Sequence, residues 1–175
     1  ETLAYFTSVK GAQYFDYTSR AERFWDGLAD DLSLALLVER QRCEMSGHRF
    51  QPIFLTENGA KGILLRANHI EDGVGRMAFE VDLTDRPYFQ SSIRTMALGS
   101  GQVRFYVAVS SGGTRISRES VASGNAPVRF DFELPGELRG PCSVQLMTEL
   151  RSDDPVTDDA NALWINPRFA RAKLA

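Results

Sequence analysis

Short segments between Met77 and Phe169 alternate apolar and polar residues one by one, and this alternation constrains the fold of the chain more than any other feature. Side chains of a β-strand point to opposite faces with a period of two, so each segment predicts a strand with one buried and one solvated face. The residues predicted to point inward are Met77, Phe79, Val81 and Leu83; Val103, Phe105, Val107 and Val109; Val128, Phe130, Phe132 and Leu134; and Cys142, Val144, Leu146 and Leu150.

Residues typical of β-turns separate these predicted strands. Asp72-Gly73, Gly112-Gly113, Ser123-Gly124-Asn125 and Pro135-Gly136 all lie between alternating segments. Several short strands at this spacing favour a sandwich or a barrel over a fold that alternates strands and helices. The sequence therefore predicts an all-β fold, with antiparallel strands in two stacked sheets.

The length of 175 residues suits one globular domain, which we expect to span residues 1–175. Within it, residues 61–175 are predicted to form the main sandwich, and residues 1–60 to add strands and a short helix or irregular segment. Because the chain begins with Glu1 rather than Met, we expect a trimmed product or an excised domain.

The N-terminal third has the least regular pattern. Ser19 is a candidate cap for a helix that should end near Gly27. The run 32–40 is ambiguous: its leucine and alanine content favours a helix, whereas a sandwich would place a strand there. A further strand is predicted from Phe50 to Thr56.

The charge balance excludes some classes of partner. With 20 basic and 23 acidic residues the net charge is -3, which gives no electrostatic footprint for a nucleic-acid binder or a polybasic membrane anchor. No apolar run approaches the roughly 20 residues that span a bilayer. We therefore expect no nucleic-acid partner and no membrane span.

The sequence lacks the motifs of common catalytic sites. It has two histidines, His48 and His69, and no GxSxG elbow, HExxH helix, Walker loop or GxGxxG turn. The two cysteines, Cys43 and Cys142, do not form a CxxC pair, and a disulfide between them stays open. We predict that the chain is not an enzyme.

An acidic loop at residues 152–161 is the densest charge cluster. Oxygen ligands from Asp153, Asp158 and Asp159 would suit a structural calcium ion, although the loop lacks the spacing of an EF-hand. The alternative is a solvated loop in which Asp and Asn side chains bond to the backbone.

Aromatic residues outside the predicted core are candidates for sugar contact, because the apolar face of a pyranose stacks on an aromatic ring. Trp25 and Tyr106 belong to this group, Trp25 in the less regular N-terminal third and Tyr106 on the outward face of its predicted strand. Trp164, in contrast, is expected in the core of the last strand.

The order of segments from Ala60 onward resembles the carbohydrate-binding modules named NPCBM, which are jelly-roll β-sandwiches related to galactose-binding-like domains. The similar segments are Lys61–Ala67 after a lysine-glycine step, Phe89–Ile93, Val103–Ile116 across a glycine pair, and Asp158–Trp164. The ending Trp164–Phe169 also resembles the last strand of sandwich domains appended to bacterial glycosyltransferases. The resemblance implies a jelly roll and an accessory domain of a polysaccharide enzyme.

Two functions are compatible with these features. In the first, the chain is a non-catalytic module that binds a glycan or polysaccharide and accompanies a catalytic domain in the same full-length chain. The candidate ligand-binding residues are Arg66, Asn68, His69, Tyr106 and Trp25. In the second, the same sandwich is a structural or oligomerisation domain without a sugar site, since a fold alone does not define a function.

Overall fold

The computed structural model describes residues 31–46, 53–57, 60–68, 74–98, 102–151 and 159–173. By its internal contacts the chain divides into Glu1–Leu32 and Ser33–Ala175, and the fold described here is that of the second unit. The helix expected after Ser19 lies outside the described residues, and the expectation of one domain over the whole chain stays a prediction.

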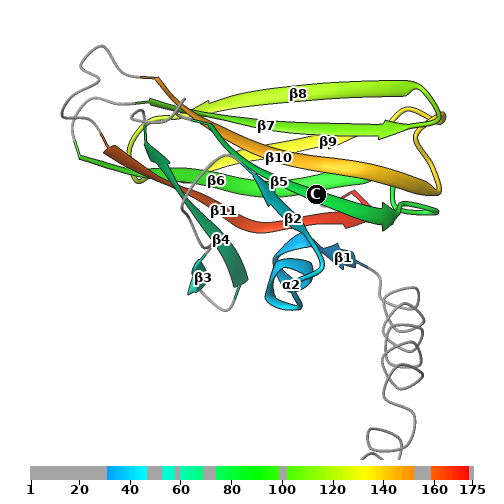
Figure 1. Cartoon of the computed structure of the whole chain (residues 1–175), viewed down its shortest axis with the longest axis horizontal. Helices are drawn as coiled ribbons and strands as arrows, with labels where there is room; N and C mark the ends of the chain where they lie inside the picture. The colour runs from blue at the N-terminus through cyan, green and yellow to red at the C-terminus, as the bar shows by residue number, and fades with distance from the viewer. Residues whose placement is uncertain are drawn as a thin grey trace, which may run out of the picture. The chain divides into compact units, whose positions relative to one another are not determined.

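Strands dominate the described part of the chain (Figure 1). The one described helix is α2 (Leu34–Glu39), so the ambiguous run 32–40 is helical over most of its length, while its first two residues belong to a short strand. The strands are β1 (Asp31–Ser33), β2 (Glu44–Ser46), β3 (Ile53–Glu57), β4 (Ala60–Asn68), β5 (Val74–Asp82), β6 (Tyr88–Leu98), β7 (Gln102–Ser111), β8 (Thr114–Ala122), β9 (Val128–Glu133), β10 (Pro141–Arg151) and β11 (Asp159–Ala170).

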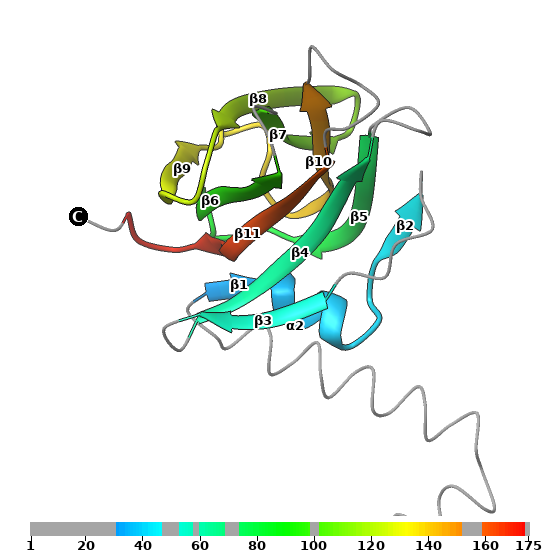
Figure 2. The same ribbon diagram turned by 90° about the vertical axis from the view of Figure 1, so that its left-hand side faces the viewer.

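The strands form two antiparallel sheets. The first sheet has the order β3-β4-β11-β6-β9, and the five-stranded sheet has the order β2-β5-β10-β7-β8. From β4 to β11 the chain passes repeatedly from one sheet to the other, so that β11 lies between β4 and β6 while β10 lies between β5 and β7 (Figure 2). This interleaving is that of a jelly roll, and it confirms the predicted all-β sandwich.

The alternating segments bury the predicted face in β7 and β10. Val103, Phe105, Val107 and Val109 are all fully buried, and the inward residues of β10 are at most 8% exposed. Among the predicted inward residues, Val81 and Phe132 are only half-buried and Val128 is 37% exposed. It begins β9, the edge strand of the first sheet, where pairing with β6 covers one side only.

An aromatic cluster joins the two sheets. Trp164 of β11 is fully buried, and its ring meets Phe105 of the opposite sheet edge-on at a centroid distance of 5.0 Å. On its own sheet it stacks on Phe130 at 6.0 Å and meets Phe89 edge-on at 6.4 Å. The structure therefore confirms the predicted core position of Trp164.

Helix α2 packs over β4 and β11, on the side of the first sheet that faces away from the five-stranded sheet. Ser33 caps the helix, since its hydroxyl accepts a hydrogen bond from Leu36 N at 3.2 Å. Leu34, Ala35, Leu37 and Val38 are buried by this packing. Leu163, on the face of β11 opposite to Trp164, is consequently fully buried as well.

A β-bulge lets the central strand β11 accommodate a proline. Its register with β6 shifts between Ile165 and Arg168, where Asn166 has a left-handed φ of 49°. Pro167 has no N–H to donate, so it is tolerated in a central strand only at such a bulge. The hydroxyl of Ser91 donates to Ile165 O at 3.1 Å, which gives this carbonyl a partner beside the bulge.

The turn after β5 holds an acid-sensitive contact. Thr84 donates to Asp82 Oδ1 from its hydroxyl at 2.7 Å and from its backbone N–H at 2.9 Å. These hydrogen bonds lower the pKa of the Asp82 carboxyl below its ordinary value, because they favour the charged form.

Acid should therefore weaken this turn. A carboxyl whose pKa is lowered by folding stabilises the protein above its unfolded pKa of about 3.9, and this contribution is lost as pH falls through the folded pKa. For an exposed group we expect roughly 0.5 kcal/mol or less. Urea unfolding of the wild type and Asp82→Asn should show a smaller stability loss below about pH 4 in the variant. Identical pH profiles for the two proteins would contradict this assignment.

Candidate functional site on the outer face of the five-stranded sheet

The outward-pointing side chains of the five-stranded sheet form regular cross-strand rows, which we call the outer face. Their positions follow from the register of β5, β10, β7 and β8. The three central rows are Arg76–Met147–Tyr106–Glu119, Ala78–Gln145–Ala108–Ser117 and Glu80–Ser143–Ser110–Arg115. Most of these residues are partly or fully exposed, so the face presents many polar groups to the solvent.

Tyr106 is the aromatic residue of this face, and two charged neighbours fix its phenol group. Arg104 Nη1 donates to the phenol oxygen at 2.9 Å, and the phenol donates to Glu149 Oε2 at 2.8 Å. The Arg104 guanidinium also lies 5.7 Å from the ring centroid. Partial burial is the main cause that raises the pKa of Tyr106, so the phenol stays protonated and donates at neutral pH. The ring is therefore held in one orientation.

A depression of about 400 Å³ lies at the end of this face, beside the β7–β8 turn. Its polar lining comes from all four strands, with the Glu80 carboxylate and the Arg115 guanidinium on the two outer strands and Ser143 and Ser110 between them. The turn itself is tight, since Gly112 and Gly113 both have positive φ, as the predicted glycine pair requires. Carboxylate, hydroxyl and guanidinium groups thus lie within one shallow site.

A second depression of about 340 Å³ shares Glu80 with the first. It extends over Ala78 to Glu44 at the start of β2 and to Gln41 and Arg42 before it. In the neighbouring row, the side chains of Ala78, Ala108 and Ser117 are small, and Gln145 is the one large side chain. The outer face therefore offers an extended, shallow and polar surface instead of one deep cavity.

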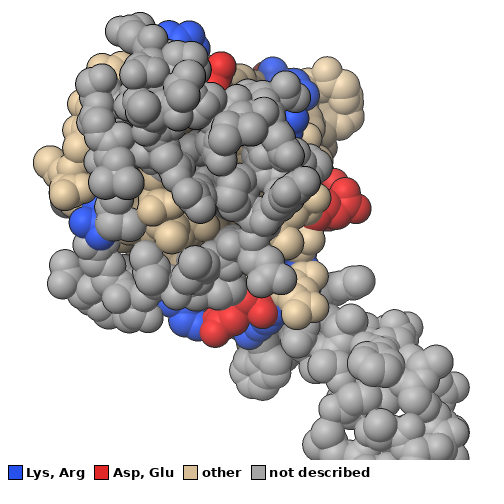
Figure 3. All heavy atoms as spheres, turned by 60° about the vertical axis from the view of Figure 1, so that its left-hand side comes forward, with Lys and Arg blue, Asp and Glu red and all other residues tan. Residues whose placement is uncertain are grey.

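Charged side chains of both signs occur on the part of the surface that Figure 3 shows. The described basic and acidic side chains form small groups there, and at the lower edge the two signs lie together. Their mixture agrees with the balanced composition of the chain. Among the described residues, no helix is both long and apolar enough to cross a membrane.

The structure places the predicted ligand-binding residues in different parts of the fold. Tyr106 lies on the outer face, as expected from the alternation of β7. Arg66 and Asn68 are in β4 of the first sheet, where their Cα partners in β11 are Asn161 and Asp159. A role in sugar binding stays a prediction for all three candidates.

Trp25 and His69 lie outside the described residues, as do Asp153 and Asp158 of the predicted calcium loop. Asp159 is the first residue of β11. In the part of the chain that the structure describes, no group of three or more His, Cys, Asp or Glu side chains is arranged to hold a metal. The calcium site therefore stays a prediction.

Both cysteines are free thiols. Cys142 is 3% exposed and occupies the core position predicted for it. Burial raises the pKa of the Cys142 thiol, which keeps it protonated at neutral pH. Cys43 is half-buried, and its pKa is raised by burial in the same way.

Several residues of the outer face were not singled out by the sequence. Arg104 and Glu149 stand at outward positions of their own predicted strands, but the alternation does not show that β7 pairs with β10. Glu80 and Arg115 are likewise brought into one row only by two intervening strands. The sequence showed only that these four residues point outward from their strands.

Solved structures share this fold at low sequence identity. An exo-β-agarase matches with a TM-score of 0.53 and 13% identity over 76% of this chain and 23% of its own. A second agarase matches with a TM-score of 0.52 and 13% identity over 84% of this chain and 25% of its own. The chain therefore spans about a quarter of the length of these agarases.

A family 28 carbohydrate-binding module specific for non-crystalline cellulose matches with a TM-score of 0.50 and 11% identity. This match covers 75% of the present chain and 88% of the module. Neither a protein-family model nor a curated protein matches the sequence. The class defined by these comparisons is a fold class: the chain is a jelly-roll β-sandwich of the kind found in carbohydrate-binding modules.

Proposed function

We propose that the chain is a non-catalytic module that binds a saccharide on the outer face of the five-stranded sheet. The observation that carries this proposal is the fixed Tyr106 ring on an open face whose other groups are carboxylates, guanidinium groups, an amide and hydroxyls. An aromatic ring packs against the apolar face of a pyranose, and these polar groups match its hydroxyls as donors and acceptors. The shared fold of a carbohydrate-binding module supports the same function.

The shape of the face favours a chain-like saccharide over a small enclosed ligand. The two depressions share Glu80, and the Tyr106 row lies two residues before the Ala108 row in β7. An extended surface of this kind would contact several sugar units. Binding fixes the conformation of a flexible saccharide, and the solvent-exposed contacts of this face must offset that loss of entropy. We therefore expect weak binding to one short oligosaccharide.

We also propose an accessory role beside a catalytic domain that acts on a polysaccharide. The two agarases support this role, because this fold matches only about a quarter of each of those longer chains. Attachment to an enzyme would raise the effective concentration of a weak binding site near its substrate. The expected result is that deleting the module from a full-length chain lowers turnover of the insoluble polysaccharide more than turnover of soluble fragments.

A screen of immobilised neutral and acidic oligosaccharides tests the binding function. The isolated chain should be retained by at least one saccharide and should release no shorter product from it, as judged by chromatography. Replacing Glu80 by Gln or Arg115 by Gln should weaken retention, since either change removes a charged hydrogen-bonding partner. If the folded chain is retained by none of the immobilised saccharides, the proposed function is wrong.

The alternative of a structural or oligomerisation domain makes a different prediction. The large apolar side chains exposed among the described residues are Met45, Val121 and Val128, which lie on three different strands. They do not occupy one cross-strand row, and β8 carries Arg115, Arg118 and Glu119 along an edge of its sheet. Self-association that is lost on substitution of these apolar residues, without saccharide binding, would favour the alternative.

A further inference from the structure

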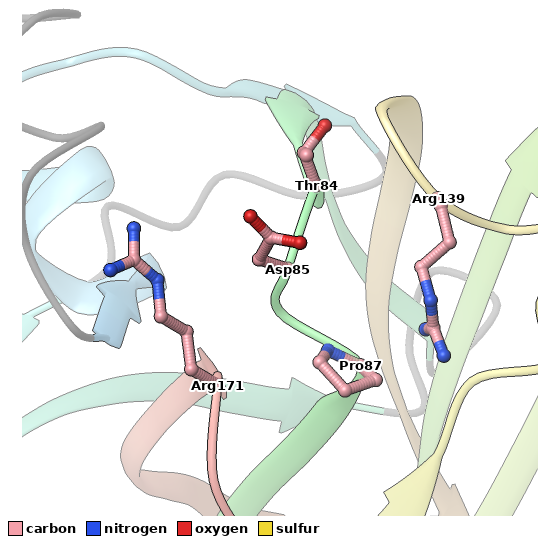
Figure 4. Close-up of a pocket in the computed structure, with 5 residues that line it drawn as sticks. All are labelled: Thr84, Asp85, Pro87, Arg139 and Arg171. Atoms are coloured by element: carbon pink, nitrogen blue, oxygen red, sulfur yellow. The ribbon is translucent and has the colours of Figure 1, made fainter.

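A third depression lies apart from the outer face, at the turn that follows β5. It has a volume of about 710 Å³, and it is lined by Thr84, Asp85 and Pro87 of the β5–β6 turn, Arg139 of the β9–β10 loop and Arg171 after β11 (Figure 4). Three segments distant in sequence thus contribute to one site.

The backbone holds the walls of this depression in place. Leu83 N donates to Gly140 O at 2.7 Å, which ties the turn after β5 to the β9–β10 loop. Leu134 N donates to Pro87 O at 2.8 Å at the other end of the same loop. A site with walls fixed in this way is largely formed before any ligand arrives.

Arg139 is the unusual residue of the site. Its Nη1 atom is buried, and it has no hydrogen-bond partner among the described residues. A guanidinium group has five N–H donors in a rigid fork, and those on Nη1 have no protein partner among the described residues. Buried polar groups normally have hydrogen-bond partners, and an anion bound beside Arg139 would supply one when the side chain turns Nη1 toward the depression.

Two further charged residues, Asp85 and Arg171, line the depression beside Arg139. Figure 4 places Asp85 between Arg139 and Arg171, so that two guanidinium groups and one carboxylate line the site. Asp85 has a left-handed φ of 60°, a conformation that Asp and Asn accept more readily than most residues.

We propose that this depression binds an oxyanion, a carboxylate or a sulfate group, through the guanidinium group of Arg139. Arg171 adds attraction from the other side of the turn, and Asp85 limits affinity by repulsion. The group can belong to an acidic saccharide or to a free ion, because the chemistry of recognition is the same. The proposal does not depend on sugar binding at the outer face.

Titration of the whole chain at low ionic strength, followed by amide NMR shifts, tests this site with four probes: sodium sulfate, sodium acetate, glucuronate and glucose. Sulfate, acetate or glucuronate should shift amides near Arg139, and glucose should not. Tighter binding of glucuronate than of acetate and sulfate would identify an acidic sugar, whereas equal binding would identify a site for simple anions. Both results support the oxyanion site, and no shift with any of the three anions would overturn it.

Matched variants separate binding from a structural effect. Arg139→Gln should weaken anion binding about tenfold or more, because it removes a charged donor, and Arg171→Gln should weaken it less. Asp85→Asn tolerates the same backbone conformation and should tighten binding by about threefold, because it removes repulsion. Arg118→Gln removes an exposed arginine of β8 that does not line the depression, and it should leave the affinity for the anion unchanged.

Tighter anion binding by the Asp85→Asn variant is a result that general destabilisation of the protein would not produce. Weaker binding in this variant, or an equal loss in Arg139→Gln and Arg118→Gln, would overturn the proposal. Tyr106→Ala serves as a separate control, since it alters the outer face and should leave anion binding unchanged. Failure of the anion site is thereby distinguished from failure of the proposed saccharide function.

Discussion

Replacing Trp164 by Ala should destabilise the fold by about 3 to 5 kcal/mol, the cost typical of truncating a large buried aromatic side chain. The ring is fully buried and contacts Phe105 across the two sheets as well as Phe89 and Phe130 within its own. Its loss leaves a cavity where the sheets meet. Equilibrium unfolding in urea, monitored by far-UV circular dichroism, measures the change.

Two further variants make this expectation specific. Trp164 Nε1 is buried and has no hydrogen-bond partner among the described residues, so burial of the indole N–H costs stability instead of adding to it. Trp164→Phe keeps an aromatic ring and removes that donor, and it should cost less than half as much as Trp164→Ala. Val128→Ala, at an exposed apolar position, should stay within about 0.5 kcal/mol of the wild type. A Trp164→Ala chain as stable as Val128→Ala would contradict the proposed core.

Replacing Tyr106 by Ala should weaken saccharide binding about tenfold or more, which corresponds to about 1.4 kcal/mol. The variant removes the ring on which a sugar would pack and also the phenol that joins Arg104 to Glu149. Isothermal titration with a saccharide from the screen measures this loss. Because Tyr106 is on the outer face, the variant should still fold.

The contribution of the ring can be separated from that of the hydroxyl. Tyr106→Phe keeps the ring and should retain affinity within about threefold, since the lost hydroxyl already bonds to protein groups. Tyr88→Ala removes a half-buried tyrosine from β6 in the first sheet and should leave affinity unchanged. Equal losses in the Tyr106→Ala and Tyr88→Ala variants would show that the effect is not local to the outer face.

The sequence was sufficient to predict which residues of the main strands point inward. Hydrophobic alternation depends on the local geometry of a strand, so β7 and β10 are correctly described by their own residues. Val128 lies on the inward face, opposite the buried Ile93, but it is 37% exposed because alternation does not show where a strand begins or whether it lies at an edge. The exposure of that residue depends on the neighbours that β9 lacks.

The sequence predicts which face of a strand is buried more readily than which strands lie beside it. Glu149 lies 43 positions after Tyr106, yet the pairing of β10 with β7 brings its carboxylate to the phenol. Nothing within either segment encodes that pairing, which depends on the topology of the whole jelly roll. The same reason explains why Arg139 and Asp85 were not recognised as parts of one depression.

The proposed function requires a saccharide to bind to the outer face of the five-stranded sheet. Amide NMR shifts of the isotope-labelled chain, titrated with a saccharide from the screen, locate the binding surface. The largest shifts are expected at Tyr106, Gln145, Ser143 and Arg115. Shifts confined to the first sheet, or a saccharide that binds with no shift at these residues, would contradict the proposed function.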